Sequence, residues 1–230
     1  MAPAEAGTRV LGTPPGPSCD DGLIKDDGTA ETGWGWVPTA IRGEYVQEFN
    51  SAELPTRYID RVCLCFLRTQ ADDDLDFDLV FYRPNADGLP DGITPFAVVP
   101  GQIRDVPLGV ANPAFTEVQI ASPVEVPAGT FFVGARWNPG VDQFFFLCSD
   151  TTPSTPRTNL WWIDDRSAEW DNAFTTTDPI FANHRAALVR PVALEDATGI
   201  DGVEVPVGSN ALALLAIVLA GAGLFRLWRA

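Results

Sequence analysis

The chain has 230 residues, with 31 Asp and Glu against 15 Lys and Arg, and a formal net charge of −16 at pH 7. An acidic surface repels phosphates, so this balance argues against nucleic acid as a partner and against peripheral binding to anionic lipid. Residues 19–193 are long enough for one domain with a sizeable core. We expect a flexible segment before them, over residues 1–18, and a linker after them, over residues 194–210.

Residues 19–193 predict short β-strands separated by Gly and Pro turns, with no helix-period segment before Asn210. Leu75–Tyr82 alternates between inward apolar residues and outward residues, which is typical of a strand with one wet side. Tyr58–Leu67 carries apolar side chains on both faces, which predicts a central strand. The expected strands are 35–37, 44–50, 58–67, 75–82, 93–99, 114–120, 129–137, 143–149, 159–163 and 185–193. This pattern predicts an all-β, antiparallel, jelly-roll-like sandwich.

The glycine in the middle of the expected strand 129–137, Gly134, has no side chain to pack. Such a position marks a β-bulge or a close approach by another backbone.

The four cysteines are even in number and spread across the domain, which in an exported chain predicts two disulfides. Cys63 and Cys65 lie on one face of the same expected strand, so a bond between them would bend that strand sharply. We therefore expect Cys19 and Cys148 each to bond to one member of this pair, with the choice of partner open. The alternative, a zinc or redox site, is disfavoured by the C-x-C spacing and by a single histidine.

Two acidic segments raise the question of calcium. The aspartates of Cys19–Gly33 lack the spaced ligand series of a calcium loop, so we expect a solvated acidic loop. Asn85, Asp87 and Asp91 offer oxygen ligands, but the same residues also form tight turns, which we favour. The expectation is therefore a chain without a cofactor, with calcium as the alternative.

Signatures of the common hydrolases and nucleotide-binding enzymes do not occur in the sequence. The one histidine, His184, is expected to be structural. A glycosidase needs two carboxyl groups across a cleft, and the candidates are Asp72–Asp74, Asp164, Asp165, Glu169 and Asp171. We expect these carboxylates to lie in solvated loops, and the chain not to be an enzyme.

Three tryptophans form the better binding candidate. Trp161 and Trp162 are neighbours on an expected strand, so they must point to opposite faces. With Trp170 on the acidic segment that follows, one of them would form a platform on which a sugar ring stacks. The alternative is that Trp170 clamps its turn over the core of the domain.

The last segment, Val205–Ala230, has a different character from the rest of the chain. An apolar run of 15 residues, Ala211–Phe225, follows a hinge and is closed by Arg226 and Arg229. As a helix the run is about 22 Å long, short of the roughly 30 Å hydrocarbon core, but snorkelling arginines extend its reach. We expect a transmembrane helix over residues 211–230 with its C-terminus in the cytoplasm and the domain outside.

Val205-Pro206, a short polar spacer, the apolar helix and the arginine tail together resemble the C-terminal sorting signals of the PEP-CTERM and IPTL-CTERM families of Gram-negative bacteria. The segments C-D-D-G at Cys19, V-C-L-C at Val62 and G-A-R-W at Gly134 resemble a domain of secreted bacterial proteins with such tails. The resemblance implies a protein exported across the inner membrane, held there at least transiently, and processed by an exosortase-type protease. A signal peptide is expected upstream of Ala2-Pro3-Ala4, which has the form of a cleavage site.

These observations predict an exported, periplasmic or cell-surface protein with a non-catalytic structural, adhesive or binding role. A matrix component such as exopolysaccharide is the partner implied by the resemblance. The alternative function is a carbohydrate-binding or glycoside-cleaving domain that uses the tryptophans and nearby carboxylates.

Overall fold

The computed structural model describes residues 19–35, 43–69, 74–109, 114–137, 145–152, 156–164, 169–172 and 183–194. All of them belong to the first of the two units into which the chain divides, Met1–Glu195. The described part is built of strands, with only two short 3₁₀ helices, η1 (Cys19–Asp21) and η2 (Ser51–Glu53). The strands are β1 (Thr32–Gly35), β2 (Gly43–Asn50), β3 (Tyr58–Arg68), β4 (Leu75–Tyr82), β5 (Ala97–Ile103), β6 (Phe115–Glu125), β7 (Thr130–Trp137), β8 (Phe145–Asp150), β9 (Leu160–Asp164), β10 (Asp171–Asn172), β11 (Ala186–Ala187) and β12 (Val189–Ala193).

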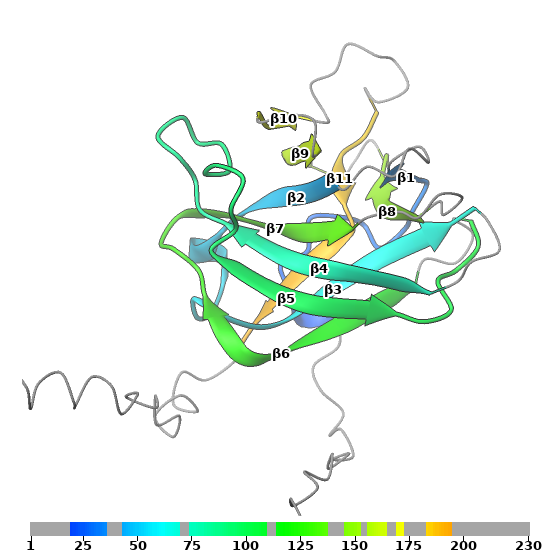
Figure 1. The fold of residues 1–230 in the computed structure, drawn as a ribbon, viewed down its shortest axis with the longest axis horizontal. Coiled ribbons are helices and arrows are strands. Elements are labelled where there is room, and N and C mark those ends of the chain that lie inside the picture. The colour runs from blue at the N-terminus through cyan, green and yellow to red at the C-terminus, as the bar shows by residue number, and fades with distance from the viewer. Residues whose placement is uncertain are drawn as a thin grey trace, which may run out of the picture. The chain divides into compact units, whose positions relative to one another are not determined.

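The strands form two antiparallel sheets, which confirms the prediction of an all-β sandwich (Figure 1). Sheet 1 has the order β1-β8-β3-β12, with β6 beside β3 and β11 beside β8. Sheet 2 has the order β10-β9-β2-β7-β4-β5. In Figure 1, β7, β4 and β5 lie side by side, and the long green connection from β4 to β5 projects at the left of the view.

Aromatic side chains between the two sheets form the main core. Phe66 of β3 meets Trp137 of β7 edge-on, with 5.3 Å between ring centroids, and meets Phe77 of β4 at the same distance. Phe49 and Phe131 stack on neighbouring strands of sheet 2. These rings are almost completely buried, so the contact of sheet 1 with sheet 2 is mainly aromatic.

The central strand is β3, as the apolar residues on both of its faces predict. It pairs with β6 along one edge and with β12 and then β8 along the other. Its residues Val62–Phe66 are all at most 1 % exposed. One face of the strand looks into the main core, and the other packs against Leu188, Ala30 and Phe115.

Two disulfides start from β3. Cys19 bonds to Cys63, and Cys65 bonds to Cys148 of β8, so each member of the C-x-C pair takes one distant partner, as expected. No cysteine is left free. The first bond closes a span of 44 residues and ties the acidic Cys19 loop to sheet 1, and the second ties two strands of that sheet across a span of 83 residues. Both lower the entropy of the unfolded chain.

The strand boundaries differ from the prediction mainly at the sheet edges. The strand expected at 93–99 is Ala97–Ile103, and the strand expected to end at residue 120 continues to Glu125. The Pro-Gly and Ser-Pro pairs at Pro100 and Pro123 indicated breaks, but both lie inside strands. Among the described strands, β5 and β6 each pair on one side only, and an edge strand tolerates proline because its outer N–H groups need no partner. The last expected strand is divided at Leu188 into β11 and β12.

Of the two interpretations left open for Gly134, a bulge or a close approach, the structure shows the close approach, and the ladders on both sides run without a bulge. Gly134 lies between Val46 of β2 and Val80 of β4. A Cβ atom at this position would overlap the Tyr45 carbonyl oxygen and lie 2.8 Å from the Val46 Cα. Both obstacles are backbone atoms of a central strand, so neither moves aside without distorting sheet 2.

We predict that Gly134→Ala lowers the free energy of unfolding by about 2 kcal/mol or more, because the added methyl group must push β2 and β7 apart. Chemical denaturation of the full chain measures this. The matched control is Gly88→Ala in the β4–β5 turn, where the φ angle is 79° and no atom lies within 4 Å of the new Cβ. We expect Gly88→Ala to lower the free energy of unfolding by only the strain of a positive φ angle, about 1 kcal/mol. Equal losses in the two variants would contradict the close approach.

Candidate functional site

Of the two neighbouring strand tryptophans, only one lies with Trp170. Trp162 pairs with Tyr45 and packs against the main core between the sheets. Trp161 is on the opposite face, the outer face of sheet 2, next to Val46. Trp170 packs on the same outer face, so the structure brings Trp161 and Trp170 into one cluster and leaves Trp162 out of it.

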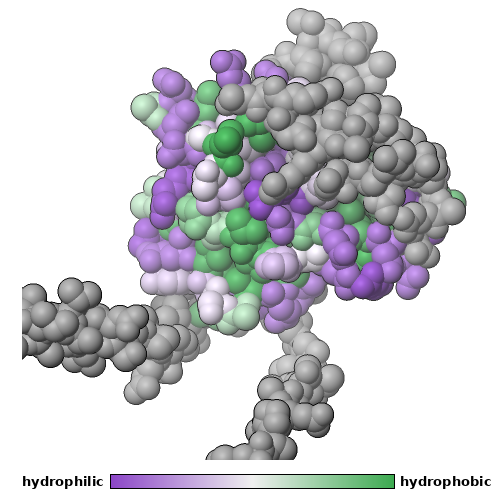
Figure 2. Space-filling model, viewed as in Figure 1, coloured by the Kyte–Doolittle hydropathy of each residue, from purple (hydrophilic) through white to green (hydrophobic). Residues whose placement is uncertain are grey.

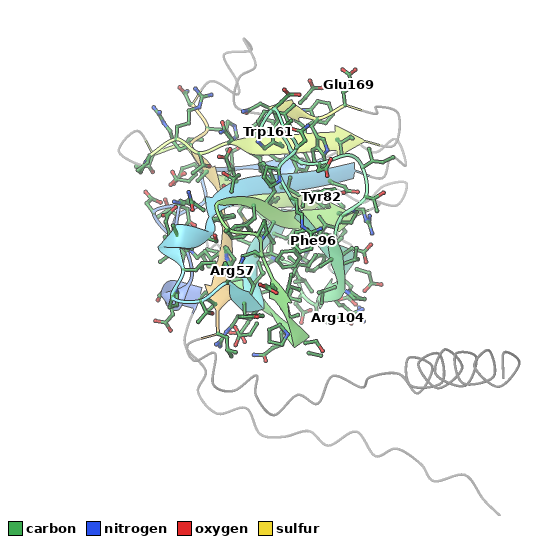
Figure 3. The ribbon with its side chains drawn as sticks, turned by 90° about the vertical axis from the view of Figure 1, so that its left-hand side faces the viewer. Arg57, Tyr82, Phe96, Arg104, Trp161 and Glu169 are labelled. Carbon is green, nitrogen blue, oxygen red and sulfur yellow. A yellow bond between two sulfur atoms is a disulfide. The ribbon has the colours of Figure 1, made fainter. Side chains whose placement is uncertain are left out.

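This outer-face cluster has a buried base of four residues, Val46, Val80, Tyr82 and Phe132, none more than 1 % exposed. The sequence predicts that Val80 and Tyr82 face solvent, and this is wrong, because the outer face of sheet 2 is covered here. In Figure 3, Trp161 and Glu169 lie at the top of the view, with Tyr82 below Trp161.

Trp170 fastens the β4–β5 connection to this cluster. Its indole ring meets the Tyr82 ring edge-on at 5.0 Å, and its Nε1 donates a hydrogen bond to the Gly92 carbonyl oxygen at 2.6 Å. Tyr82 in turn contacts the same connection, because its hydroxyl oxygen lies 3.4 Å from the Ile93 carbonyl oxygen. Trp170 therefore acts as a clamp, over the outer face of sheet 2 rather than over the main core.

The strand registers place the outward residues of sheet 2 in rows across the sheet. One row runs from β5 to β2 and contains Pro100, Asp78, Arg136 and Glu44, and the next runs from β5 to β9 and contains Val98, Val80, Gly134, Val46 and Trp161. The first row is charged with alternating signs, and the second is apolar. The outer face thus changes from polar to apolar between adjacent rows.

The charged row is a hydrogen-bonded relay that begins at a buried tyrosine. The Tyr82 hydroxyl donates to Glu44 at 2.6 Å, and Arg136 donates to the other Glu44 oxygen at 3.4 Å and to Asp78 at 2.8 Å. Burial by itself would lower the pKa of Arg136, but its hydrogen bond to Asp78 and the negative charges of Glu44 and Asp78 outweigh this and raise that pKa. The guanidinium is therefore charged and fixed.

A hollow of about 520 Å³ opens at the polar end of this face, across β4, β5 and β7. Its wall contains two carboxylates, an amide, a guanidinium and two aromatic rings, and consists of Asp76, Phe77, Asp78, Pro100, Gly101, Gln102, Arg136 and Trp137. The Phe77 ring lies over Gly101 of the neighbouring strand, where a Cβ would be 2.7 Å from its Cε2. The volume is within the range of pockets that bind small molecules.

Three aspartates of the Cys19 loop, Asp20, Asp26 and Asp27, are hydrogen-bonded to protein groups. Asp26, with no exposed side-chain surface, and the exposed Asp20 both accept hydrogen bonds from Arg190. Asp27, Glu31 and Asp150 form a second group whose carboxylate oxygens lie within 4.8 Å of one another. The side-chain and backbone hydrogen bonds from Thr29 lower the pKa of Asp27.

The loop expected to be solvated is therefore partly buried, and Asp150 of β8, which bonds to it, is completely buried. Backbone N–H groups of Asp27 and Thr152 donate to the Asp150 carboxylate, and that of Thr151 donates to Glu31. In the other acidic segment, Asn85 Oδ1 accepts from the backbone N–H groups of Asp87 and Leu89, which is the turn role that we favour over calcium.

His184 is only 3 % exposed and has a structural environment. Its Nδ1 lies 2.8 Å from the Ser149 hydroxyl, its ring packs on Trp34 at 4.5 Å, and Ser149 is completely buried. Because the Ser149 hydroxyl donates to the Ala186 carbonyl oxygen, it accepts the Nδ1 proton of a neutral imidazole. Burial, with a smaller contribution from the positive charge of Arg157, lowers the pKa of His184 from 6.5 to about 4.

The carboxylates considered for glycoside cleavage are scattered through the chain. Asp74 pairs with Arg104, and Glu169 and Asp171 are exposed. Asp72, Asp73 and Asp165 lie outside the described residues, as does the side chain of Asp164.

No protein-family model, curated protein or solved structure matches this chain. Among the described residues, no helix is long and apolar enough to cross a membrane. The expected sorting segment, with Val205, Pro206, Arg226 and Arg229, lies outside these residues.

The relay of Tyr82, Glu44, Arg136 and Asp78 was not found in the sequence. Each residue lies in an expected strand, but the four meet only because β2 pairs with β7 and β7 pairs with β4. The only sequence signal for the relay is that outward positions of three strands carry charges of opposite sign. This signal identifies which charges meet only when the strand register is known.

We predict that stability falls as the pH is lowered from 7 to 5, by about 2 kcal/mol from His184 alone. The folded-state pKa of about 4 is below the ordinary 6.5, so the unfolded chain takes up the proton first. The stabilisation is complete above pH 6.5 and is lost as the pH falls towards 4. Urea titrations at several pH values measure it, and His184→Gln should remove most of the slope between pH 7 and 5.

As this is the only histidine of the chain, its own titration is visible by NMR without assignment. An imidazole that titrates near 6.5 in the folded protein would contradict the buried, neutral state.

Proposed function

We propose that this protein is an exported, non-catalytic β-sandwich domain that acts at the cell surface or in the matrix as a structural, adhesive or binding module. The observation that supports it best is the pair of disulfides, Cys19–Cys63 and Cys65–Cys148, because such bonds persist in oxidising compartments outside the cytoplasm. We include in the proposal a jelly-roll topology, since successive strands from β1 to β4 and from β6 to β9 alternate between the two sheets.

The C-terminal segment supplies the second half of the proposal. Val205-Pro206, the apolar run and Arg226 with Arg229 act as a sorting signal that holds the chain in the inner membrane. An exosortase-type membrane protease is the partner that this signal implies. The acidic domain, with a net charge of −16 for the chain, then faces away from the cytoplasm.

We predict that cells that make this protein from its own gene place it in the envelope fraction, where added protease reaches the domain. Peptide mapping without reduction should recover both disulfides from that material. Replacing Arg226 and Arg229 by Gln should reduce the membrane-bound fraction several-fold, because the positive charges orient and retain the helix.

The matched control replaces two arginines of the domain, Arg57 and Arg104, by Gln. Both are exposed, pair among the described residues with Glu125 and Asp74, and lie below Trp161 in Figure 3. This control changes the net charge equally and should leave localisation unchanged. Four free thiols in the envelope material, or a cytoplasmic protein, would refute the proposal.

The second candidate function is carbohydrate binding. It is favoured by Trp161 and Trp170, two partly exposed tryptophans in one cluster on the outer face of sheet 2. Indole rings offer apolar faces against which sugar C–H groups pack.

A glycan array with the full chain tests this candidate. Trp161→Ala should lower the array signal at least tenfold if this indole contacts the glycan, whereas Leu108→Ala, at a 65 % exposed residue outside the cluster, should not change it. If the unaltered chain binds no glycan, carbohydrate binding is refuted and the exported structural role remains.

A further inference from the structure

The hollow at the polar end of sheet 2 has unused hydrogen-bonding capacity. Gln102 donates to one oxygen of Asp76, and both N–H groups that Arg136 directs at Asp78 go to a single oxygen, Oδ2, at 3.1 and 2.8 Å. No described residue donates to Asp76 Oδ2 or to Asp78 Oδ1. The wall therefore holds two free carboxylate oxygens, the Gln102 carbonyl oxygen, and the remaining N–H groups of Gln102 and Arg136.

These groups are held in place by the sheet and by the relay behind it. Asp76 is paired with Gln102, and Asp78 is paired with Pro100 on one side and Arg136 on the other, all in continuous ladders. Arg136 is fixed from behind by Glu44, which the buried Tyr82 hydroxyl fixes in turn. A site on strands with such support is already arranged for its ligand.

The chemistry of the wall selects a class of ligand. The two carboxylates repel an anionic ligand. A metal ion is also disfavoured, because the guanidinium between Asp78 and Glu44 offsets the negative charge that would hold it. Carboxylate acceptors beside guanidinium and amide donors match vicinal hydroxyl groups, each of which donates one hydrogen bond and accepts others. Phe77 and Trp137 also line the hollow, but at 5 % and 2 % exposure they belong to the main core, so contact with a ligand falls to the polar groups.

We propose that this hollow binds a neutral saccharide, with Asp76, Asp78 and Gln102 on its hydroxyl groups and Arg136 on an oxygen. The inference rests on the proposed role as an exported binding module, for which it names the ligand class and a site separate from the tryptophan cluster. A volume of about 520 Å³ accommodates a short saccharide rather than a long chain.

The test is calorimetric titration of the full chain, in a detergent without a sugar headgroup, with cellobiose, maltose and diacetylchitobiose. The double variant Asp76→Ala with Gln102→Ala should weaken the binding of at least one of these at least tenfold. Both side chains are exposed and bond to each other, so their removal leaves the fold intact.

The chain provides a closely matched control in the Glu117 and Gln119 pair. Gln119 donates to Glu117 on the exposed side of edge strand β6, within one strand rather than across two, and this pair lies outside the hollow. The double variant Glu117→Ala with Gln119→Ala removes the same groups and should bind saccharide like the unaltered chain.

Three results would overturn the proposal. One is that none of the saccharides binds. Another is that both double variants weaken binding equally. The third is that binding is lost in Trp161→Ala but retained in the Asp76 and Gln102 variant, which places the glycan on the tryptophans. None of these bears on export, which the fractionation experiment tests separately.

Discussion

The structure depends first on the burial of β3 on both faces and its pairing along both edges. A strand in this position must satisfy every backbone hydrogen bond with neighbours, and β6, β12 and β8 provide them. One face carries Phe66 into the aromatic contact with sheet 2, and the other carries the two half-cystines. The disulfides thus attach the Cys19 loop and β8 to the strand that is least free to move.

The Cys19 loop covers the second face of this strand and explains why charges are buried there. Arg190 of β12 is 4 % exposed, donates to the completely buried Asp26 carboxylate, and lies 4.1 Å from the centre of the Phe115 ring. A buried ion pair of this kind contributes little net stability, but removal of either member leaves an uncompensated charge. The pair therefore serves to fix how the loop lies on sheet 1.

Sheet 2 has a comparable arrangement on its own outer face. Gly134 lets β2 and β7 approach closely, and Val46, Val80 and Phe132 around it form an apolar surface that Trp161 and Trp170 cover. Tyr82 belongs to this apolar layer through its ring and to the charged row through its hydroxyl. Its position joins the two halves of the face, so the hollow lies beside a rigid layer. In the view of Figure 2, hydrophilic side chains are frequent along the left margin of the coloured part, and hydrophobic ones gather near its middle.

The sequence by itself determined the all-β class, the central strand, and that Cys63 and Cys65 each bond to a distant cysteine. Apolar alternation and the C-x-C spacing can both be recognised within a single strand, without knowledge of its neighbours. The sequence limited Gly134 to a β-bulge or a close approach by another backbone. Only the tertiary structure decided which cysteine pairs with which, that Trp161 joins Trp170 rather than Trp162, and that Tyr82, Glu44, Arg136 and Asp78 meet. Each of these depends on the pairing of strands far apart in the chain, and a shift of one residue in register would have turned every side chain to the other face.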